Sequence, residues 1–210
     1  MKQGVLLVFL AGTAFADDTP TERAVARRAQ DVQPAQVGQR APAGVLLTPE
    51  REAVDLAVRY AQTPTMLLFY RGGWCPYCNV HLGTIQSVER EMRELGFQVV
   101  AISPDTPENL AESVSKQALT YTLLSDSAMD VTRAFGLAFE VDDATRQRYR
   151  DFGIDLEAAS GRSHHLLPVP AVYLVDRGGI VRFAHWNPDY TTRLGPEELL
   201  TAARGLATAP

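Results

Sequence analysis

The sequence predicts an α/β fold in three layers, with a mixed central sheet that is parallel at its centre and helices on both faces. Between residues 65 and 136, short apolar runs bounded by proline or glycine alternate with segments of helical period. After residue 169, two strand-like runs flank a tight turn, which indicates a hairpin. The 46% hydrophobic and 21% charged content argues against a disordered chain or a membrane bundle.

The first sixteen residues have the pattern of a secretory signal peptide. Lys2 gives a positive start, the run GVLLVFLAG is too short to span a bilayer, and Ala14-Phe15-Ala16 matches a small-x-small cleavage site. We therefore expect residues 1–16 to be removed, leaving an exported protein in the bacterial periplasm with no stable membrane insertion. An uncleaved start or a membrane anchor is the alternative.

Residues 17–60 are expected to form a lead-in segment and the first elements of the domain. Residues 17–36 are rich in Ala, Arg and Gln with a weak helical period, so they predict a helical lead-in to a domain over 37–210. A short strand is expected at 45–47. A helix is expected over 49–60, because proline suits a first helical position.

From residue 65 the elements alternate regularly. Apolar or β-branched runs predict buried strands at 65–70, 97–103 and 122–124. Helices are expected to begin at Pro76, at Thr106-Pro107 and at Ser125-Asp126, the first ending at Gly96 and the third at Gly136. The hairpin strands are expected at 172–176 and 180–184, followed by a helix over 196–206. The polar segment 140–168 predicts one helix at 143–152 and a loop carrying Ser163, His164 and His165; no role is predicted for it.

The charge of the chain argues against polyanionic partners. The net charge is −5 and no run of Lys or Arg exceeds two residues, so the footprint of a nucleic-acid or anionic-membrane binding protein is absent.

The chemistry is concentrated in FYRGGWCPYC, which holds both cysteines of the chain. Cys75 falls where a buried strand turns into a helix, so the free N–H groups of the helix N-terminus stabilise its thiolate. Cys-x-x-Cys sites lower the pKa of the first thiol to roughly 3.5–7.5. Cys78 lies one helical turn further on, within reach of any oxidised form of Cys75. Spacing therefore predicts Cys75 as nucleophile, Cys78 as resolving thiol, and a redox disulfide between them.

Three other interpretations of the pair are weaker. A bridge that closes so short a loop removes little entropy from the unfolded chain, which disfavours a structural staple. Cys75, Cys78 and His81 form a C-x2-C-x2-H run, but no second ligand pair follows at zinc spacing, so no metal is predicted. A c-type haem needs His where Asn79 stands. No cofactor is predicted.

Neighbouring residues are candidates for support of the site. Arg71 could supply a cation to the thiolate or be a solvated charge at a strand end. Trp74 and Tyr77 could shield the thiols and meet a partner, or simply pack. Pro170 comes just before a buried strand, an unusual place for a residue that cannot donate to the ladder. The histidines at 81, 164, 165 and 185 are candidates for proton transfer, or ordinary surface and packing residues.

Together these motifs resemble the thioredoxin-fold superfamily, and within it the peroxiredoxin-like branch of the AhpC/TSA (redoxin) family. The resemblance covers about residues 37–205 and rests on GQRAP, FYRGGWCPYC, VAISPDTPEN, LLSD, AFGL and LPVPAVYLVDRGGIVRF. It implies a three-layer thioredoxin-like fold, and a cis Pro170 that faces the dithiol. Members carry Pro and Thr or Ser where Leu68 and Gly72 stand, and an Arg about where Pro170 lies; those groups position the peroxide.

Two functions follow as expectations. The first is a thiol-dependent peroxidase with an antioxidant role, in which Cys75 attacks a hydroperoxide and Cys78 closes a disulfide. The second is a thiol:disulfide oxidoreductase acting on exported proteins, which the missing peroxide-positioning groups favour. A non-enzymatic binding module is the third. Either redox function needs an external thioredoxin-like dithiol as reductant.

Overall fold

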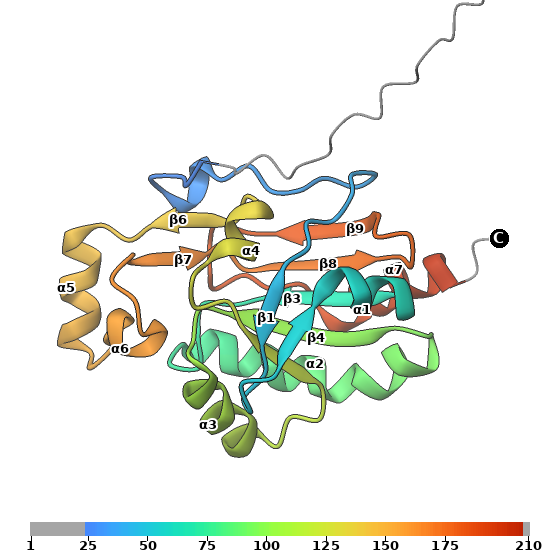
Figure 1. Cartoon of the computed structure of the whole chain (residues 1–210), viewed down its shortest axis with the longest axis horizontal. Coiled ribbons are helices and arrows are strands. Elements are labelled where there is room, and N and C mark those ends of the chain that lie inside the picture. Colours follow the sequence, from blue (N-terminus) through green and yellow to red (C-terminus); the bar gives the residue numbers. More distant parts are fainter. Residues whose placement is uncertain (1–23, 208–210) are drawn as a thin grey trace, which may run out of the picture.

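The computed structural model describes residues 24–207, so the predicted signal peptide at 1–16 lies outside the described residues. A seven-stranded mixed sheet in the order β2-β1-β5-β4-β3-β8-β9 forms the centre (Figure 1). Its strands are β1 Val45–Leu47, β2 Ala53–Asp55, β3 Thr65–Phe69, β4 Gln98–Ser103, β5 Thr122–Ser125, β8 Ala171–Val175 and β9 Val181–Trp186. The three central strands β5, β4 and β3 are parallel, and β8 pairs antiparallel with β3. The predicted mixed sheet is confirmed.

Helices cover both faces of this sheet. They are α1 Leu56–Gln62, α2 Pro76–Glu94, α3 Pro107–Gln117, α4 Asp130–Ala134 and α7 Pro196–Ala207. Side chains alternate along β3, so Met66 and Leu68 join the core beneath α2, α3 and α7, whereas Leu67 and Phe69 join the core beneath α1 and α4. Burial on both faces explains why β3 is apolar from Met66 to Phe69; Thr65, at its start, is buried with its hydroxyl donating to the Thr63 carbonyl.

Two N-terminal predictions are wrong. The helix expected over 49–60 begins only at Leu56, because residues 45–55 form the antiparallel β1–β2 pair and Asp55 caps α1, accepting from the Ala57 N–H at 2.8 Å. Pro49 instead lies in the turn of that hairpin, where Arg51 has a φ of 66°.

The helical lead-in expected over 17–36 is also absent from its described part. There only η1, Ala29–Asp31, is helical, as a single 3-10 turn. The backbone of Ala26 instead bridges Phe139: its N–H donates to the Ala138 carbonyl at 3.1 Å, and its carbonyl accepts from the Glu140 N–H at 2.9 Å. Pairing with this distant strand satisfies backbone groups that a helix would otherwise have used.

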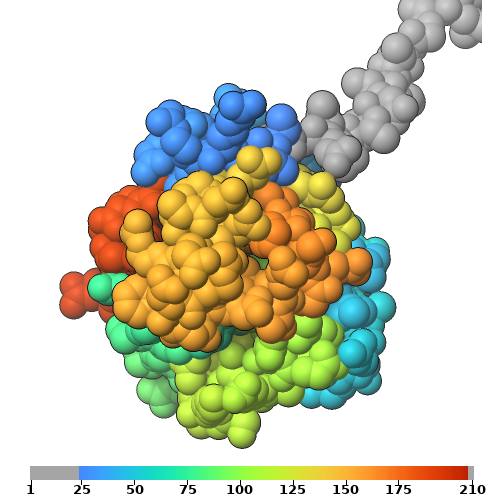
Figure 2. All heavy atoms as spheres, turned by 90° about the vertical axis from the view of Figure 1, so that its left-hand side faces the viewer, coloured from blue at the N-terminus to red at the C-terminus, as the bar shows by residue number. Residues whose placement is uncertain are grey.

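The segment 140–168 contains more structure than expected. The predicted helix is α5 Asp143–Asp151, but a second helix, α6 Leu156–Ser160, follows it. A small antiparallel sheet of β6 Ala138–Glu140 and β7 Leu166–Pro168 closes the base of the segment. Figure 2 shows the α5–α6 segment spread across one end of the molecule.

The other helices begin close to where they were expected, with one exception. Asp126 was expected to cap a helix directly, yet α4 starts at Asp130, and the Asp126 carboxylate accepts from the Val131 and Thr132 N–H groups. In residues 24–207 no helix is both long enough and apolar enough to cross a membrane.

Candidate active site

The two cysteines lie where β3 passes into α2. Cys75 is the N-cap residue of α2 with Pro76 at the first helical position, as the sequence predicts, and Cys78 is inside the first turn. Both are free thiols, and each is only 1% exposed.

The turn before Cys75 needs its glycines. Gly72 has a φ of 146°, and a Cβ there would collide with the Trp74 ring nitrogen and lie 2.8 Å from an Asp105 carboxylate oxygen. The Gly73 N–H donates to the Asp105 carboxylate at 2.8 Å. This contact fixes the turn that places Cys75 at the start of α2.

Replacing Gly72 by alanine should therefore destabilise the reduced protein by roughly 1–3 kcal/mol, the usual cost of a strained backbone conformation. Urea unfolding at neutral pH measures this. Gly83→Ala is the matched control: an added Cβ there meets no atom within 4 Å, and alanine is the better helix former by roughly 0.5–1 kcal/mol. Equal effects of the two changes would contradict the account.

Asp105 is a residue of the site that sequence reasoning did not single out, although it lies in the quoted motif VAISPDTPEN. It is 1% exposed and accepts from the Ser103 hydroxyl at 3.0 Å. Burial raises the pKa of this carboxyl to about 6, while the Gly73 N–H and Ser103 hydroxyl lower it. Its hydrogen bonds indicate a residue that positions the loop.

Arg71 is the cation of the site. The residue is 3% exposed, and its Nη1 lies 4.0 Å from the Cys75 sulfur. Aromatic rings surround it, with the guanidinium carbon 4.0 Å from the Tyr190 ring centroid and 5.1 Å from that of Trp74. No carboxylate in residues 24–207 forms an ion pair with it. Because an unpaired buried charge is costly, the Cys75 thiolate is its natural counter-charge.

A second arginine serves the second sulfur, and the sequence did not reveal it. Arg193, in the loop before α7, places its Nη2 3.6 Å from the Cys78 sulfur, 115 positions away in the chain. The same loop supplies Tyr190, whose ring meets that of Tyr77 edge-on at 5.7 Å. Tyr77 itself is 49% exposed, so it is available to a partner.

Electrostatics divide the two thiols. The pKa of Cys75 is lowered to about 6, first by the thiol of Cys78, which hydrogen-bonds to it, and then by Arg71, the Cys78 N–H and Arg193, against the opposing effect of burial. The pKa of Cys78 is raised well above the ordinary thiol value, mainly by burial and then by the adjacent Cys75. One thiolate and one thiol therefore share the site at neutral pH.

This asymmetry predicts the pH dependence of alkylation. The rate at which iodoacetamide modifies Cys75 should rise through a single titration centred near pH 6, because only the thiolate reacts. At pH 7 about nine-tenths of Cys75 would be ionised. Mass spectrometry of labelled protein across the acid and neutral range measures this, with Cys78 unlabelled as internal control. A midpoint at that of an ordinary thiol would contradict it.

Pro170 departs from expectation. No cis peptide bond occurs in residues 24–207, so the prediction of a cis Pro170 is wrong; Pro170 precedes β8, where it needs no N–H, and its carbonyl accepts from the Asn187 N–H at 3.2 Å. It lines a cavity of about 390 Å³ together with Arg71, Tyr149 and Tyr190.

No histidine of the described chain hydrogen-bonds to either sulfur. His81 is buried, and burial lowers its pKa to about 4, with Arg193 acting in the same direction. His164 contacts the Ser127 carbonyl and His165 contacts Glu157, while His185 lies on β9. No group of three metal-binding side chains is present among residues 24–207.

Comparison with known proteins finds a matching family and similar solved structures. The model of the AhpC/TSA family matches residues 37–184. Peroxiredoxin Bcp of Escherichia coli strain K12 is 31% identical over 106 residues, which cover 50% of this chain and 67% of that protein. Peroxidoxin BcpB of Mycobacterium tuberculosis superposes with a TM-score of 0.63 at 18% identity, covering 81% of this chain and 97% of that one. Reduced Prx3 of Vibrio vulnificus in complex with hydrogen peroxide superposes at 0.66 with 16% identity, covering 80% and 99%.

Proposed function

Because the chain belongs to the AhpC/TSA family and is a thiol-dependent oxidoreductase of the peroxiredoxin kind, we propose that it reduces hydroperoxides, with Cys75 as nucleophile and Cys78 as resolving thiol. The observation that carries this proposal is the buried Cys75 sulfur, whose pKa is lowered to about 6 between a donating thiol and the Arg71 cation. A reactive thiolate with its own proton-bearing partner is what a two-cysteine peroxidase requires.

The reaction proceeds in three balanced steps. The Cys75 thiolate attacks the terminal peroxide oxygen and the O–O bond breaks, so that Cys75 becomes a sulfenic acid. The departing oxygen takes one proton from solvent and leaves as an alcohol, or as water when the substrate is hydrogen peroxide. The Cys78 sulfur then attacks the Cys75 sulfur, giving a disulfide and one water. An external thioredoxin-like dithiol returns both sulfurs to thiols by exchange and is itself oxidised to a disulfide.

The raised pKa of Cys78 suits this order of events. While Cys75 is a thiolate, the buried surroundings and then the charge of Cys75 keep the proton on Cys78. Once Cys75 has been oxidised to the neutral sulfenic acid, that repulsion is gone and Arg193 favours the Cys78 thiolate. Burial still raises the pKa of Cys78, but with the charge of Cys75 gone Cys78 is a better nucleophile once its target has formed.

The groups that position the peroxide in related proteins are replaced here by Leu68, Gly72 and Pro170. Arg71 can take over part of their role. Its Nη1 lies 4.0 Å from the Cys75 sulfur, and it lines the cavity of about 390 Å³. In this site Arg71 can stabilise the negative charge that develops on the peroxide oxygens. Vibrio vulnificus Prx3, a structural relative, is described with hydrogen peroxide bound.

Disulfide exchange with exported proteins is the second candidate, and those three replaced groups favour it. The burial of both sulfurs argues the other way, since a protein disulfide must approach the sulfur in line. Export to the periplasm remains a prediction of the N-terminal sixteen residues.

Stopped-flow kinetics test the choice. Reduced protein is mixed in parallel with hydrogen peroxide, an organic hydroperoxide and a mixed-disulfide peptide, and the change in tryptophan fluorescence, from Trp74 and Trp186, is followed. The proposal expects the hydroperoxides to react much faster than a free thiol of matched pKa. Rates equal to such a thiol, together with fast reaction of the peptide, would favour the exchange enzyme.

A further inference from the structure

Tyr149 joins the segment 140–168 to the chemistry of the site. Its hydroxyl accepts a hydrogen bond from Arg71 Nη2, across 78 positions of sequence. Its ring packs against Trp74 with centroids 5.7 Å apart and lies 5.5 Å from the Arg71 guanidinium carbon. A side chain from α5 thus contacts both the cation and the indole beside Cys75.

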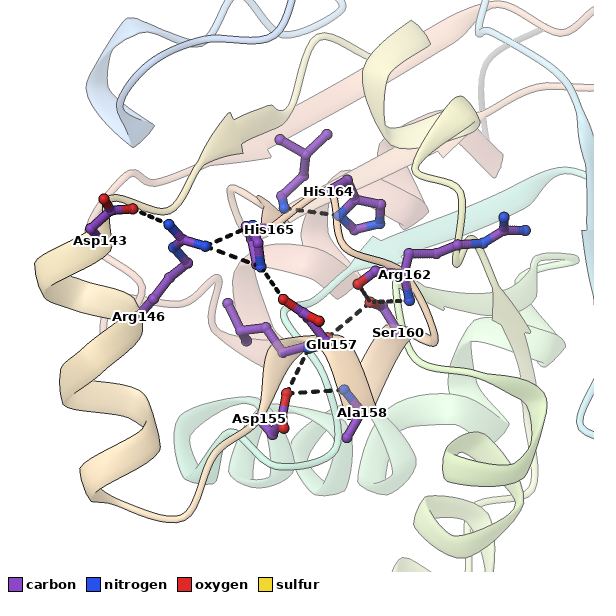
Figure 3. Close-up of polar contacts among 11 residues, drawn as sticks. Asp143, Arg146, Asp155, Glu157, Ala158, Ser160, Arg162, His164 and His165 are labelled. Atoms are coloured by element: carbon purple, nitrogen blue, oxygen red, sulfur yellow. Dashed lines mark hydrogen bonds and ion pairs between the residues drawn. The ribbon is translucent and has the colours of Figure 1, made fainter.

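The segment that carries Tyr149 is braced internally. Figure 3 shows the His165 ring lying between Arg146 of α5 and Glu157 of α6. Arg146 Nη1 is 2.8 Å from His165 Nδ1, and the Glu157 carboxylate is 2.6 Å from His165 Nε2. The Asp155 carboxylate caps α6 by accepting from the Ala158 N–H at 3.1 Å. These contacts hold the two short helices as one unit.

The same unit is attached to the loop that follows β4 and to the first turn of α3. The Thr106 N–H donates to the Ala159 carbonyl at 2.9 Å, and the Asn109 side chain donates to the same carbonyl at 2.8 Å. This loop also contains Asp105, which holds the Gly73 N–H. The segment is therefore fixed to the frame of the active site at both α5 and α6, and it covers that end of the molecule (Figure 2).

Two cavities flank the contact between Tyr149 and Trp74. One, of about 390 Å³, is lined by Gly73, Trp74 and Asp105 together with α6 residues. The other, also about 390 Å³, is lined by Arg71, Tyr149 and Pro170. Each ring lines one cavity, so the ring pair forms part of the wall between them. Neither cavity is lined by a cysteine, but Arg71, which lines the second, lies 4.0 Å from the Cys75 sulfur. Spaces of this size admit a small hydroperoxide, whereas a folded protein cannot enter them.

We propose that Tyr149 is a specificity-determining residue. In the reduced protein it closes the α5–α6 segment over Arg71 and Trp74, and so limits access to the Cys75 thiolate to molecules that fit the Arg71 cavity. Protein disulfides are thereby excluded from the reduced form, whereas the dithiol reductant acts on the oxidised form. That the molecules admitted to Cys75 are hydroperoxides rests on the proposed function. That Tyr149 restricts access to Cys75 is argued from the structure alone. Segment 140–168 thereby acquires a role that its sequence did not predict.

Two alkylating probes of different size test this on the reduced full chain. Iodoacetamide is the small probe and a maleimide carried on a polyethylene-glycol chain is the bulky one, with the labelled cysteine assigned by mass spectrometry. Tyr149→Ala should raise the ratio of bulky to small labelling at Cys75 about tenfold, because losing the ring pair and the hydrogen bond lowers the cost of opening. Phe152→Ala removes an aromatic ring that is 75% exposed at the end of the same helix, and should leave the ratio unchanged.

A second variant tests the proposal independently in case Tyr149→Ala does not fold. Arg146→Gln breaks the brace at His165 without touching Arg71, and it should also raise the ratio. Near-ultraviolet circular dichroism confirms folding of each variant. If both Tyr149→Ala and Arg146→Gln are folded and match the wild-type ratio, the proposal is overturned. If wild-type protein reduces hydroperoxides slowly but the variants have a raised ratio of bulky to small labelling, the proposed function is wrong and the access role of Tyr149 stands. If wild-type protein reduces hydroperoxides fast but the ratio is unchanged in the variants, the access role is wrong and the proposed function stands.

Discussion

Replacing Cys75 by serine should abolish hydroperoxide reduction, while Cys78→Ser should leave one turnover per protein and then stop. Serine at position 75 removes the nucleophile, and its hydroxyl ionises far outside the neutral range. Serine at position 78 still permits the first step, but the Cys75 sulfenic acid then has no neighbouring thiol to condense with. Rapid-quench measurement of peroxide consumed per protein distinguishes the two, since a stoichiometric burst is expected only from Cys78→Ser.

The same pair of variants tests the electrostatics. The largest cause of the lowered Cys75 pKa is hydrogen bonding by the Cys78 thiol, so in Cys78→Ser the Cys75 pKa should rise to the extent that a hydroxyl is a poorer partner. Thiolate absorbance followed against pH measures the change. Multiple turnovers by Cys78→Ser with no added thiol, or a burst from Cys75→Ser, would reverse the assignment of nucleophile and resolving thiol.

Replacing Arg71 by methionine should lower the rate of hydroperoxide reduction by roughly 100-fold, the typical effect of removing one preorganised donor from an active site. Two effects combine. The Cys75 pKa should rise because Arg71 is the strongest cationic influence on it, and the developing charge on the peroxide loses its donor. Methionine keeps a long, flexible side chain, so packing among the aromatic rings is retained in part.

Arg148→Met is the matched control for this change. Arg148 lies exposed on α5, so its replacement makes the same alteration of net charge close to the site without touching either sulfur. Measurements above and below pH 6 separate the two effects, because at higher pH the Cys75 thiolate is formed even without Arg71. A rate for Arg71→Met within twofold of wild type at both pH values would show that the cation does not assist the reaction.

The local parts of the site could be predicted from the sequence for a physical reason. Pro76 and the apolar run before Gly72 mark a strand that turns into a helix, and the residue before the proline then becomes the N-cap. Strand β3 was recognisable because burial on both faces makes it apolar from Met66 to Phe69, with Thr65 as its one polar residue. Errors arose where local pattern competed with pairing, as at the β1–β2 hairpin and the bridge between Ala26 and Phe139.

By itself, the sequence determined which sulfur begins a helix, which one follows a turn later, and that an arginine lies four residues before the first. Only the tertiary structure decided that Arg71 is buried among aromatic rings, that Arg193 reaches Cys78, and that Tyr149 closes over both Arg71 and Trp74. The reason is the range of each interaction. Helix and strand geometry follow from residues a few positions apart, whereas the charges and rings around the thiols come from segments 78 and 115 positions away, and no periodicity in the chain encodes such contacts.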